Sequence, residues 1–322
     1  MKIGVHMEPH VGYTFQEIAN LVQKAEELKF HHFTVSDHFF SNPSRPPTTT
    51  YEAWTLVALL TPLTDTIRLG TQVTCQSYRN PALLAKIVAN IDNASNGRID
   101  LGIGAGWKEA EYRAYGYEFP STGTRIAQLR ETLEIITRLW TEDQPPSFQG
   151  KYYRIDEAKF LPKPVQSPHV PIWVGTQTLK APKMERIIAK YADGIIYEQL
   201  PIEELRKKQE RMKDACKAQG RDYKTLKWDI NVASLIWKEE KQFDKIKQRL
   251  TRGNPELTEE KLDSLRTRWL CGPIEKVKSE IQSYEANKVD RLTLCLPMAH
   301  SCPDLEAWGI ETLELLAQHL FQ

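Results

Sequence analysis

The stretch Arg98-Ile99-Asp100-Leu101-Gly102-Ile103-Gly104-Ala105-Gly106-Trp107 has the pattern of a short buried strand that runs into three alternate glycines. Glycine has no side chain, so at the end of a strand it lets backbone N–H groups approach an anion such as a phosphate. The G-x-G-x-G spacing lacks the G-x-G-x-x-G pattern of a dinucleotide-binding turn. The stretch therefore predicts either an anion-binding turn at the end of a sheet or a tight corner between a strand and a helix.

Strand and helix patterns alternate on both sides of this stretch. The expected strands cover residues 2–6, 33–36, 67–74, 99–103, 172–174, 193–197, 229–237 and 291–295. The expected helices cover residues 14–29, 52–61, 81–94, 108–141, 180–191, 202–218, 240–288 and 304–320. Thr14 and Glu17 form a T-x-x-E capping box at the start of the first helix. Eight alternating units with no break in composition predict one α/β domain over residues 1–322, a (β/α)8 TIM barrel of eight strands.

The segment at residues 144–171 interrupts this alternation between the fourth and fifth expected strands. It contains six prolines around Gly150. Proline fixes one backbone angle and has no N–H to donate, so a regular helix cannot form there. We expect a Pro-rich surface insertion or lid. A doubly wound sheet that ends at this segment and is followed by a second domain is the alternative.

The charge balance excludes some classes of partner. The chain of 322 residues has 43 Lys and Arg against 42 Asp and Glu, a net charge of +1. Such a balance creates no strong field that would attract nucleic acid or a membrane surface. We therefore expect a small-molecule substrate, with no nucleic acid and no membrane as partner.

The cysteines and the apolar runs indicate the compartment. The five cysteines form no C-x-x-C pair, and an odd, scattered set is typical of reduced thiols. The first residues lack the apolar segment of a signal peptide, and no apolar run approaches the roughly 18 residues of a membrane span. We expect a soluble cytoplasmic protein.

The ends of the expected strands carry residues suited to binding. In a TIM barrel these ends meet at one face, where the active site lies. The polar, aromatic and glycine residues found there are His6, Glu8, Asp37, His38, Gln72, Val73, Thr74, Cys75, Trp107, Gly175, Thr176, Tyr197, Glu198, Met298 and His300. Such a set predicts a pocket for a flat, partly charged ligand.

The Asp37-His38 pair is the best candidate for moving a proton. Histidine titrates near neutral pH, and a neighbouring carboxylate can hold its tautomer. A hydrogen-bonded turn is the structural alternative. A metal site built from His6, His31, His32, Asp37 and His38 lacks the ligand spacings of known metal motifs, so we expect no metal.

Four stretches together resemble the bacterial luciferase-like superfamily, and more narrowly its branch of oxidoreductases that use the deazaflavin coenzyme F420. They are VSDHF at 35–39, IRLGT at 67–71, YRNPALLAK at 78–86 and NGRIDLGIGAGW at 96–107. The continuation EAEYRAYG at 109–116, ADG at 192–194 and CGP at 271–273 fit the same family. The resemblance covers nearly the whole chain, although flavin-using relatives share the barrel and much of the glycine segment.

The resemblance implies where a cofactor would bind. Asp37 and His38 would lie at the deazaflavin ring, with His38 as the proton donor or acceptor. The end of the third strand, Gln72, Val73 and Thr74, would lie under the ring, with a non-prolyl cis peptide between Gln72 and Val73. The residues that would surround the ribityl-phosphate arm are Gly104, Ala105, Gly106, Trp107, Gly175 and Thr176.

The activity implied is hydride transfer between the deazaflavin ring and an unidentified small organic substrate, with His38 handling the proton. Trp107 replaces a glutamate that is catalytic in a sugar-phosphate-oxidising branch, which disfavours that substrate. Two alternatives stay open. One is a monooxygenase that uses reduced flavin mononucleotide (FMN) and oxygen, and the other is a flavin-binding barrel without activity. Dimers are common among similar proteins, so a homodimer is expected.

Overall fold

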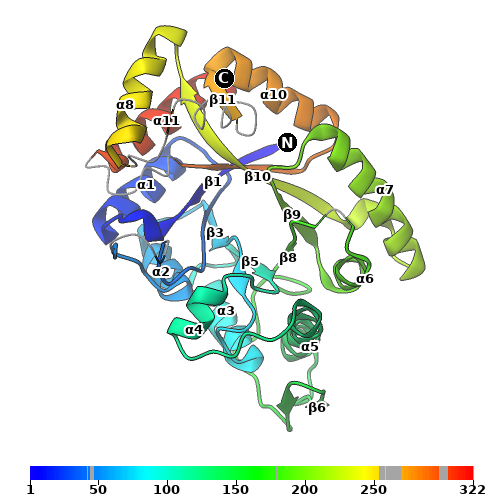
Figure 1. The fold of residues 1–322 in the computed structure, drawn as a ribbon. Helices are drawn as coiled ribbons and strands as arrows, with labels where there is room; N and C mark the ends of the chain where they lie inside the picture. The colour runs from blue at the N-terminus through cyan, green and yellow to red at the C-terminus, as the bar shows by residue number, and fades with distance from the viewer. Residues whose placement is uncertain are drawn as a thin grey trace.

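The computed structural model of this protein describes residues 1–41, 43, 47–178, 180–253, 258, 270–296 and 304–321. In this part of the chain, parallel strands close into a barrel and helices surround it (Figure 1). The eight barrel strands, in order around the barrel, are β1 (Lys2–Met7), β2 (His32–Val35), β3 (Arg68–Thr71), β5 (Ile99–Gly104), β8 (Ile172–Gly175), β9 (Gly194–Glu198), β10 (Lys227–Trp237) and β12 (Arg291–Cys295). The predicted TIM barrel is confirmed.

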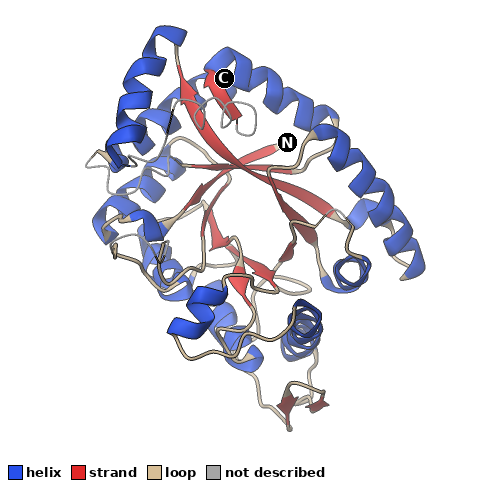
Figure 2. Ribbon diagram, in the orientation of Figure 1, coloured by secondary structure: helices blue, strands red, loops and turns tan. Residues whose placement is uncertain are grey.

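The helices lie outside the barrel, as the separation of colours in Figure 2 makes clear. They are α1 (Phe15–Glu27), α2 (Ala53–Leu60), α3 (Pro81–Ala94), α4 (Glu109–Ala114), α5 (Thr122–Thr141), α6 (Pro182–Tyr191), α7 (Ile202–Ala218), α8 (Phe243–Gly253), α10 (Ile274–Ala286) and α11 (Leu305–Leu320). Short 3-10 helices occupy Pro9–Val11, Thr61–Leu63, Tyr223–Thr225 and Glu240–Gln242. No described helix is both long and apolar enough to cross a membrane.

Local sequence signals explain several of these boundaries. The predicted capping box at α1 is present, since Glu17 N donates to Thr14 Oγ1 at 3.3 Å and Thr14 N donates to Glu17 Oε2 at 2.6 Å. Asn80 caps α3 through its side chain, and Pro81 takes the first helical position, where its missing N–H costs nothing. Strands β1 and β5 are almost wholly buried, as expected for strands covered on both faces.

The third expected strand is divided in two. Arg68–Thr71 forms β3 and Thr74–Cys75 forms β4, which pairs with β5. Between them lies a cis peptide bond at Gln72-Val73, as the family resemblance implied. The break places Gln72 and Val73 at the carboxyl-terminal face of the barrel.

The expectation of helices across residues 240–288 is wrong at residues 270–273, although α8 and α10 lie within that range. A short strand, β11 (Leu270–Pro273), pairs in parallel with the end of β10, where Ser234 is opposite Leu270. A run of four residues is too short for its periodicity to separate strand from helix. Its pairing with β10 is a tertiary contact that local patterns do not reveal.

The Pro-rich segment forms a peripheral hairpin. Strands β6 (Phe148–Gln149) and β7 (Arg154–Ile155) pair antiparallel and project from the barrel at the bottom of Figure 1. Pro162 and Pro168 follow cis peptide bonds. Because β5 before this segment pairs directly with β8 after it, the sheet continues through the insertion rather than ending in a doubly wound sheet.

A buried polar cluster occupies the amino-terminal ends of the strands, opposite the face predicted to bind ligand. Asp100 Oδ1 accepts from Arg68 Nη2 at 2.6 Å, and its Oδ2 accepts from Arg291 Nη1 at 2.7 Å. Thr293 donates to Asp229 Oδ1 at 2.7 Å. This cluster lies inside the barrel and away from the candidate site, so it contributes to the fold.

Candidate active site

A cavity of about 360 Å³ opens at the carboxyl-terminal ends of the barrel strands. All the residues predicted from the sequence to bind a cofactor line it: Asp37, His38, Gln72, Val73, Thr74, Gly104, Ala105, Gly106, Trp107, Gly175 and Thr176. Strand ends that are far apart in the sequence therefore meet around one space. Trp107 lies at its rim, with 66% of its surface exposed, and its ring meets that of His38 edge-on at 5.8 Å between centroids.

His38 is held by a buried carboxylate. Its Nδ1 atom lies 3.0 Å from Oε2 and 3.2 Å from Oε1 of Glu111, which comes from the short helix α4. An ionised carboxylate only accepts hydrogen bonds, so Nδ1 carries a proton and donates it. Nε2 of His38 has no partner among the described residues, which makes it the ring atom able to exchange a proton with a ligand.

Glu111 is surrounded by donors. Its carboxylate accepts from the backbone N–H of Phe39 at 2.9 Å, from Lys108 Nζ at 2.9 Å and from the Tyr78 hydroxyl at 3.0 Å. Burial alone would raise the pKa of Glu111, but the hydrogen bond and charge of His38, together with Lys108, lower it to about 2. Glu111 therefore stays ionised throughout the neutral range.

The sequence led us to expect that Asp37 would hold the His38 ring, but the structure shows no such contact between the two described side chains. The Asp37 carboxylate instead forms a bidentate ion pair with Arg79, with Nη1 to Oδ2 at 2.7 Å and Nη2 to Oδ1 at 2.8 Å. Cys75 N also donates to Asp37, and Arg79 further pairs with Glu52. Adjacent side chains on an extended backbone point in different directions, which explains the separation. Asp37 still lines the cavity, so its role at a cofactor remains a prediction.

The three alternate glycines meet different needs. A Cβ at Gly102 would overlap the carbonyl oxygen of Thr71 on the neighbouring strand, so this position requires glycine for strand packing. Gly106 has φ +79°, a conformation that disfavours other residues. A Cβ at Gly104 would lie 3.0 Å from Cγ2 of Val73, and one at Gly175 would lie 2.9 Å from its Cγ1. These last two glycines keep the cavity open around Val73.

Two neutral side chains in the cavity wall each have a buried polar atom with no hydrogen-bond partner within the described ranges. The atoms are Nε2 of Gln72, a donor, and Oδ1 of Asn231, an acceptor. Leaving such groups unpaired costs about 1–3 kcal/mol each, so they indicate a ligand with complementary polar atoms. The pyrimidine edge of a flavin or deazaflavin ring carries both donors and acceptors, and the residues present fit such a group.

Glu8 lies between two histidines at the end of β1. Its Oε1 is 3.3 Å from His6 Nε2, and its Oε2 is 3.1 Å from His10 Nδ1. Burial raises the pKa of Glu8, but hydrogen bonds with His10 and His6 outweigh burial and lower it well below its usual range. Ligand atoms of His6, Glu8 and Cys295 also lie within 4.8 Å of one another. Pairing with histidines accounts for this cluster, and we assign no metal to it.

The remaining predicted strand ends have different outcomes. Glu198 lines the cavity, whereas Tyr197 is buried and donates to the backbone oxygen of Thr178. Met298 and His300 lie outside the described residues.

Sequence reasoning missed Glu111 and Asn231 as site residues. A weak signal for Glu111 was present, because it lies three residues after Lys108 and directly before Tyr112, so an acid falls on the inward face of a short helix. Asn231 lies within β10 with no local motif.

Comparison with known proteins identifies the family. The model of the luciferase-like monooxygenase family matches residues 1–291. The chain belongs to the luciferase-like monooxygenase family. This luciferase-like protein is 32% identical over 184 residues to the F420-dependent glucose-6-phosphate dehydrogenase of Amycolatopsis mediterranei, and the match covers 56% of the chain and 53% of that relative. It is also 32% identical over 197 residues to the 5,10-methylenetetrahydromethanopterin reductase of Archaeoglobus fulgidus, over 61% of the chain and 52% of that relative.

The luciferase-like protein therefore spans about half the length of the curated relatives it matches.

Solved structures superpose on nearly the whole chain. Monooxygenase RslO1 from Streptomyces bottropensis superposes with a TM-score of 0.84 at 24% identity, covering 100% of this chain and 99% of that one. An F420-dependent secondary alcohol dehydrogenase in complex with an F420-acetone adduct gives 0.79 at 19% identity, covering 98% and 99%. At these identities the likeness shows the fold alone.

Proposed function

We propose that this protein is an F420-dependent oxidoreductase that transfers a hydride between the deazaflavin ring and a small organic substrate. The proposal rests on the contact between His38 and the buried carboxylate of Glu111, at a cavity that is lined in part by glycines. The relatives named for F420 support this cofactor.

The cavity residues divide between the two parts of the cofactor. Gln72 Nε2 and Asn231 Oδ1 would bond the polar edge of the ring, and Val73 would supply an apolar surface for it. The turns at residues 104–107 and 175–176 would hold the phosphate arm, because backbone N–H groups at glycine turns bind anions. Asp37 and Thr74 would complete the wall.

His38 would handle the proton that accompanies hydride transfer. The deazaflavin, when bound, supplies the carbon that accepts or releases the hydride. Glu111 fixes the Nδ1–H tautomer of His38, so Nε2 is the atom that takes a proton from a substrate hydroxyl or returns it. Glu111 also stabilises the imidazolium that forms. The rest of the contribution from the protein is positioning.

Titration of the purified protein with F420 and with FMN tests the proposal. We expect F420 to bind tightly, as measured by cofactor fluorescence, and to be reduced or oxidised with a substrate from a panel of alcohols and carbonyl compounds. Tight binding of reduced FMN with oxygen-dependent turnover would support the monooxygenase alternative instead. Binding of F420 without hydride transfer to any compound would favour a non-catalytic barrel.

We also propose that residues 1–322 form one domain that works as a homodimer in the cytoplasm. Leu59 on α2 and Leu83 on α3 are 48% and 55% exposed, and their burial against a second copy would be favourable. Cys75, Cys216 and Cys295 are free thiols, as is usual in a reducing compartment. Analytical ultracentrifugation tests the dimer, and a monomer at micromolar concentration would contradict it.

A further inference from the structure

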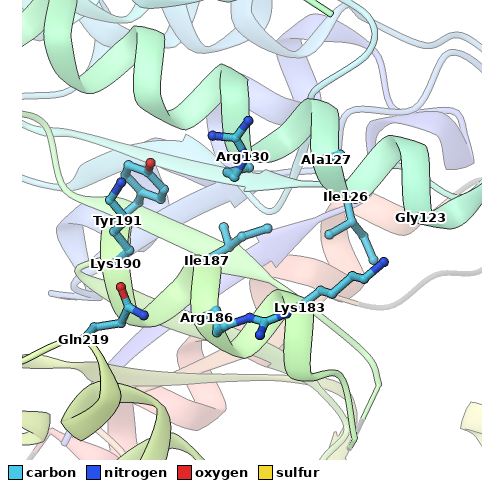
Figure 3. A pocket seen from close by; sticks show the side chains of 10 residues that line it. All are labelled: Gly123, Ile126, Ala127, Arg130, Lys183, Arg186, Ile187, Lys190, Tyr191 and Gln219. Atoms are coloured by element: carbon cyan, nitrogen blue, oxygen red, sulfur yellow. The ribbon is translucent and has the colours of Figure 1, made fainter. Parts of the chain in front are cut away.

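A second hollow, on the outside of the barrel, lies between α5 and α6. This groove has a volume of about 400 Å³. Its floor is apolar and includes Ile126 and Ile187, and its rim carries the basic side chains Arg130, Lys183, Arg186 and Lys190. Figure 3 shows Arg130 on α5 at one side of the groove and the basic residues of α6 at the other.

The cations of the groove are only partly neutralised. Arg130 lies 3.2 Å from Glu131, and Lys190 lies 3.5 Å from Glu134. Lys183 and Arg186 have no ion-pair partner within the part of the chain that the structure describes. The whole chain has a net charge of only +1, so this concentration of cations is local. It favours an anionic ligand.

The groove begins where the cofactor cavity ends. Ile126 lines both hollows. Thr122 and Met184 line the cavity, while their chain neighbours Gly123 and Lys183 line the groove. A ligand chain that leaves the cavity past Ile126 would therefore pass directly between the two rows of cations.

We propose that the groove binds the acidic tail of coenzyme F420. Beyond its phosphate, F420 continues through a lactyl group into a chain of glutamates, and each glutamate adds a carboxylate. FMN ends at the phosphate and would leave the groove empty. Lys183 and Lys190 are separated by about 10 Å along α6, since a helix rises about 1.5 Å per residue, so the groove can take more than one carboxylate. This inference rests on the proposed function and assigns Lys183 and Arg186 as tail-binding residues.

Binding titrations with two forms of the cofactor test the proposal. One form is F420 with its glutamate tail, and the other is F420 from which the glutamates have been removed. At low ionic strength we expect the unmodified protein to bind the tailed form about tenfold more tightly, an advantage that salt would reduce. The double variant Lys183→Glu/Arg186→Glu should lose that advantage while binding the tailless form within about twofold of the unmodified protein.

The matched control reverses two charges elsewhere. Lys238→Glu/Lys245→Glu changes the net charge by the same amount. Lys238 directly follows β10, and Lys245 lies in α8, which is on the other side of the barrel from α5 and α6 (Figure 1). This control should keep the preference for the tailed form. Equal affinities of the unmodified protein for the two forms, or a preference that survives in the Lys183→Glu/Arg186→Glu variant, would overturn the inference but leave the proposed function standing. Failure of the tailless form to bind would overturn the proposed function itself.

Discussion

Nδ1 of His38 lies 3.0 Å from Oε2 of Glu111, a carboxylate that no solvent reaches. The two residues are 73 positions apart in the chain and come from different strand-to-helix connections. Because Glu111 is ionised and surrounded by donors, it fixes both the tautomer and the orientation of the imidazole. This contact makes Glu111 a positioning residue for His38, to which we assign the proton transfer.

Replacing Glu111 by glutamine tests this role. Glu111→Gln removes the charge that stabilises the imidazolium, so kcat should fall about tenfold or more, and the acidic limb of the pH–rate profile should move to lower pH. The affinity for F420, measured by fluorescence, should change less than kcat. Glu109→Gln on the same helix is the control, because Glu109 is exposed and pairs with the exposed Arg113. An unchanged pH profile in Glu111→Gln would contradict the assignment.

Removing the imidazole tests His38 directly. His38→Ala should still bind F420, since the residues proposed to hold the ring edge and the phosphate arm, Gln72, Asn231 and the glycine turns, are unchanged in this variant. Its rate of hydride transfer at saturating substrate should fall about 100-fold or more, because the variant lacks the imidazole that is proposed to move the proton. Single-turnover absorbance of the cofactor measures this step. A rate equal to that of the unmodified enzyme would remove His38 from the mechanism.

The Asp37–Arg79 ion pair should matter chiefly for stability. Asp37→Ala leaves the buried Arg79 without its bidentate partner, and loss of one member of a buried pair costs about 3–5 kcal/mol. Urea denaturation measures the loss. Glu52→Gln, which alters the more exposed partner of the same arginine, should cost less. Equal stability of Asp37→Ala and the unmodified protein would show that the pair contributes little.

Two glycine substitutions should separate ligand binding from folding. Gly104→Ala places a methyl group 3.0 Å from Cγ2 of Val73, inside the cavity, and should weaken F420 binding about tenfold while changing stability by about 1 kcal/mol or less. Gly102→Ala forces a methyl group against the backbone of Thr71 and should destabilise the barrel by about 3 kcal/mol or more. Normal cofactor affinity in Gly104→Ala would place the ligand elsewhere.

The pH dependence of stability should reveal Asp229. Burial raises the pKa of Asp229 to about 6. The charge of Arg291 and the hydrogen bond from Thr293 lower this pKa but do not outweigh burial. An acid whose pKa is higher in the folded chain holds its proton more tightly there, so its contribution to stability falls as pH rises from about 4 to about 6 and stays low above that. The change in the free energy of unfolding caused by Asp229→Asn should therefore be more favourable at pH 7.5 than at pH 4. We expect the difference between the two changes to be up to about 3 kcal/mol.

Denaturation at the two pH values measures that difference. Asp244→Asn, at a side chain that is 82% exposed, provides the control and should show no such pH dependence. If Asp229→Asn changes the free energy of unfolding by the same amount at both pH values, folding does not raise the pKa of Asp229.

Much of the barrel and of the cavity lining could be predicted from the sequence, because the signals are local. Alternation of apolar runs with amphipathic helices identifies βα units, and Gly106 has a left-handed backbone conformation, with φ +79°, that favours glycine at its own position. His38 comes three residues after the end of β2, so the topology of a TIM barrel places it at the cavity.

Only the tertiary structure decided which groups contact one another. The partner of His38 is Glu111 rather than its sequence neighbour Asp37, which is taken by Arg79. The pairing of β11 with β10 depends in the same way on segments that are distant in the chain. The sequence determined which residues reach the mouth of the barrel, since strand ends and turns obey local geometry. The closed sheet determined their partners, since a hydrogen bond or ion pair depends on distances in space that no spacing along the chain encodes.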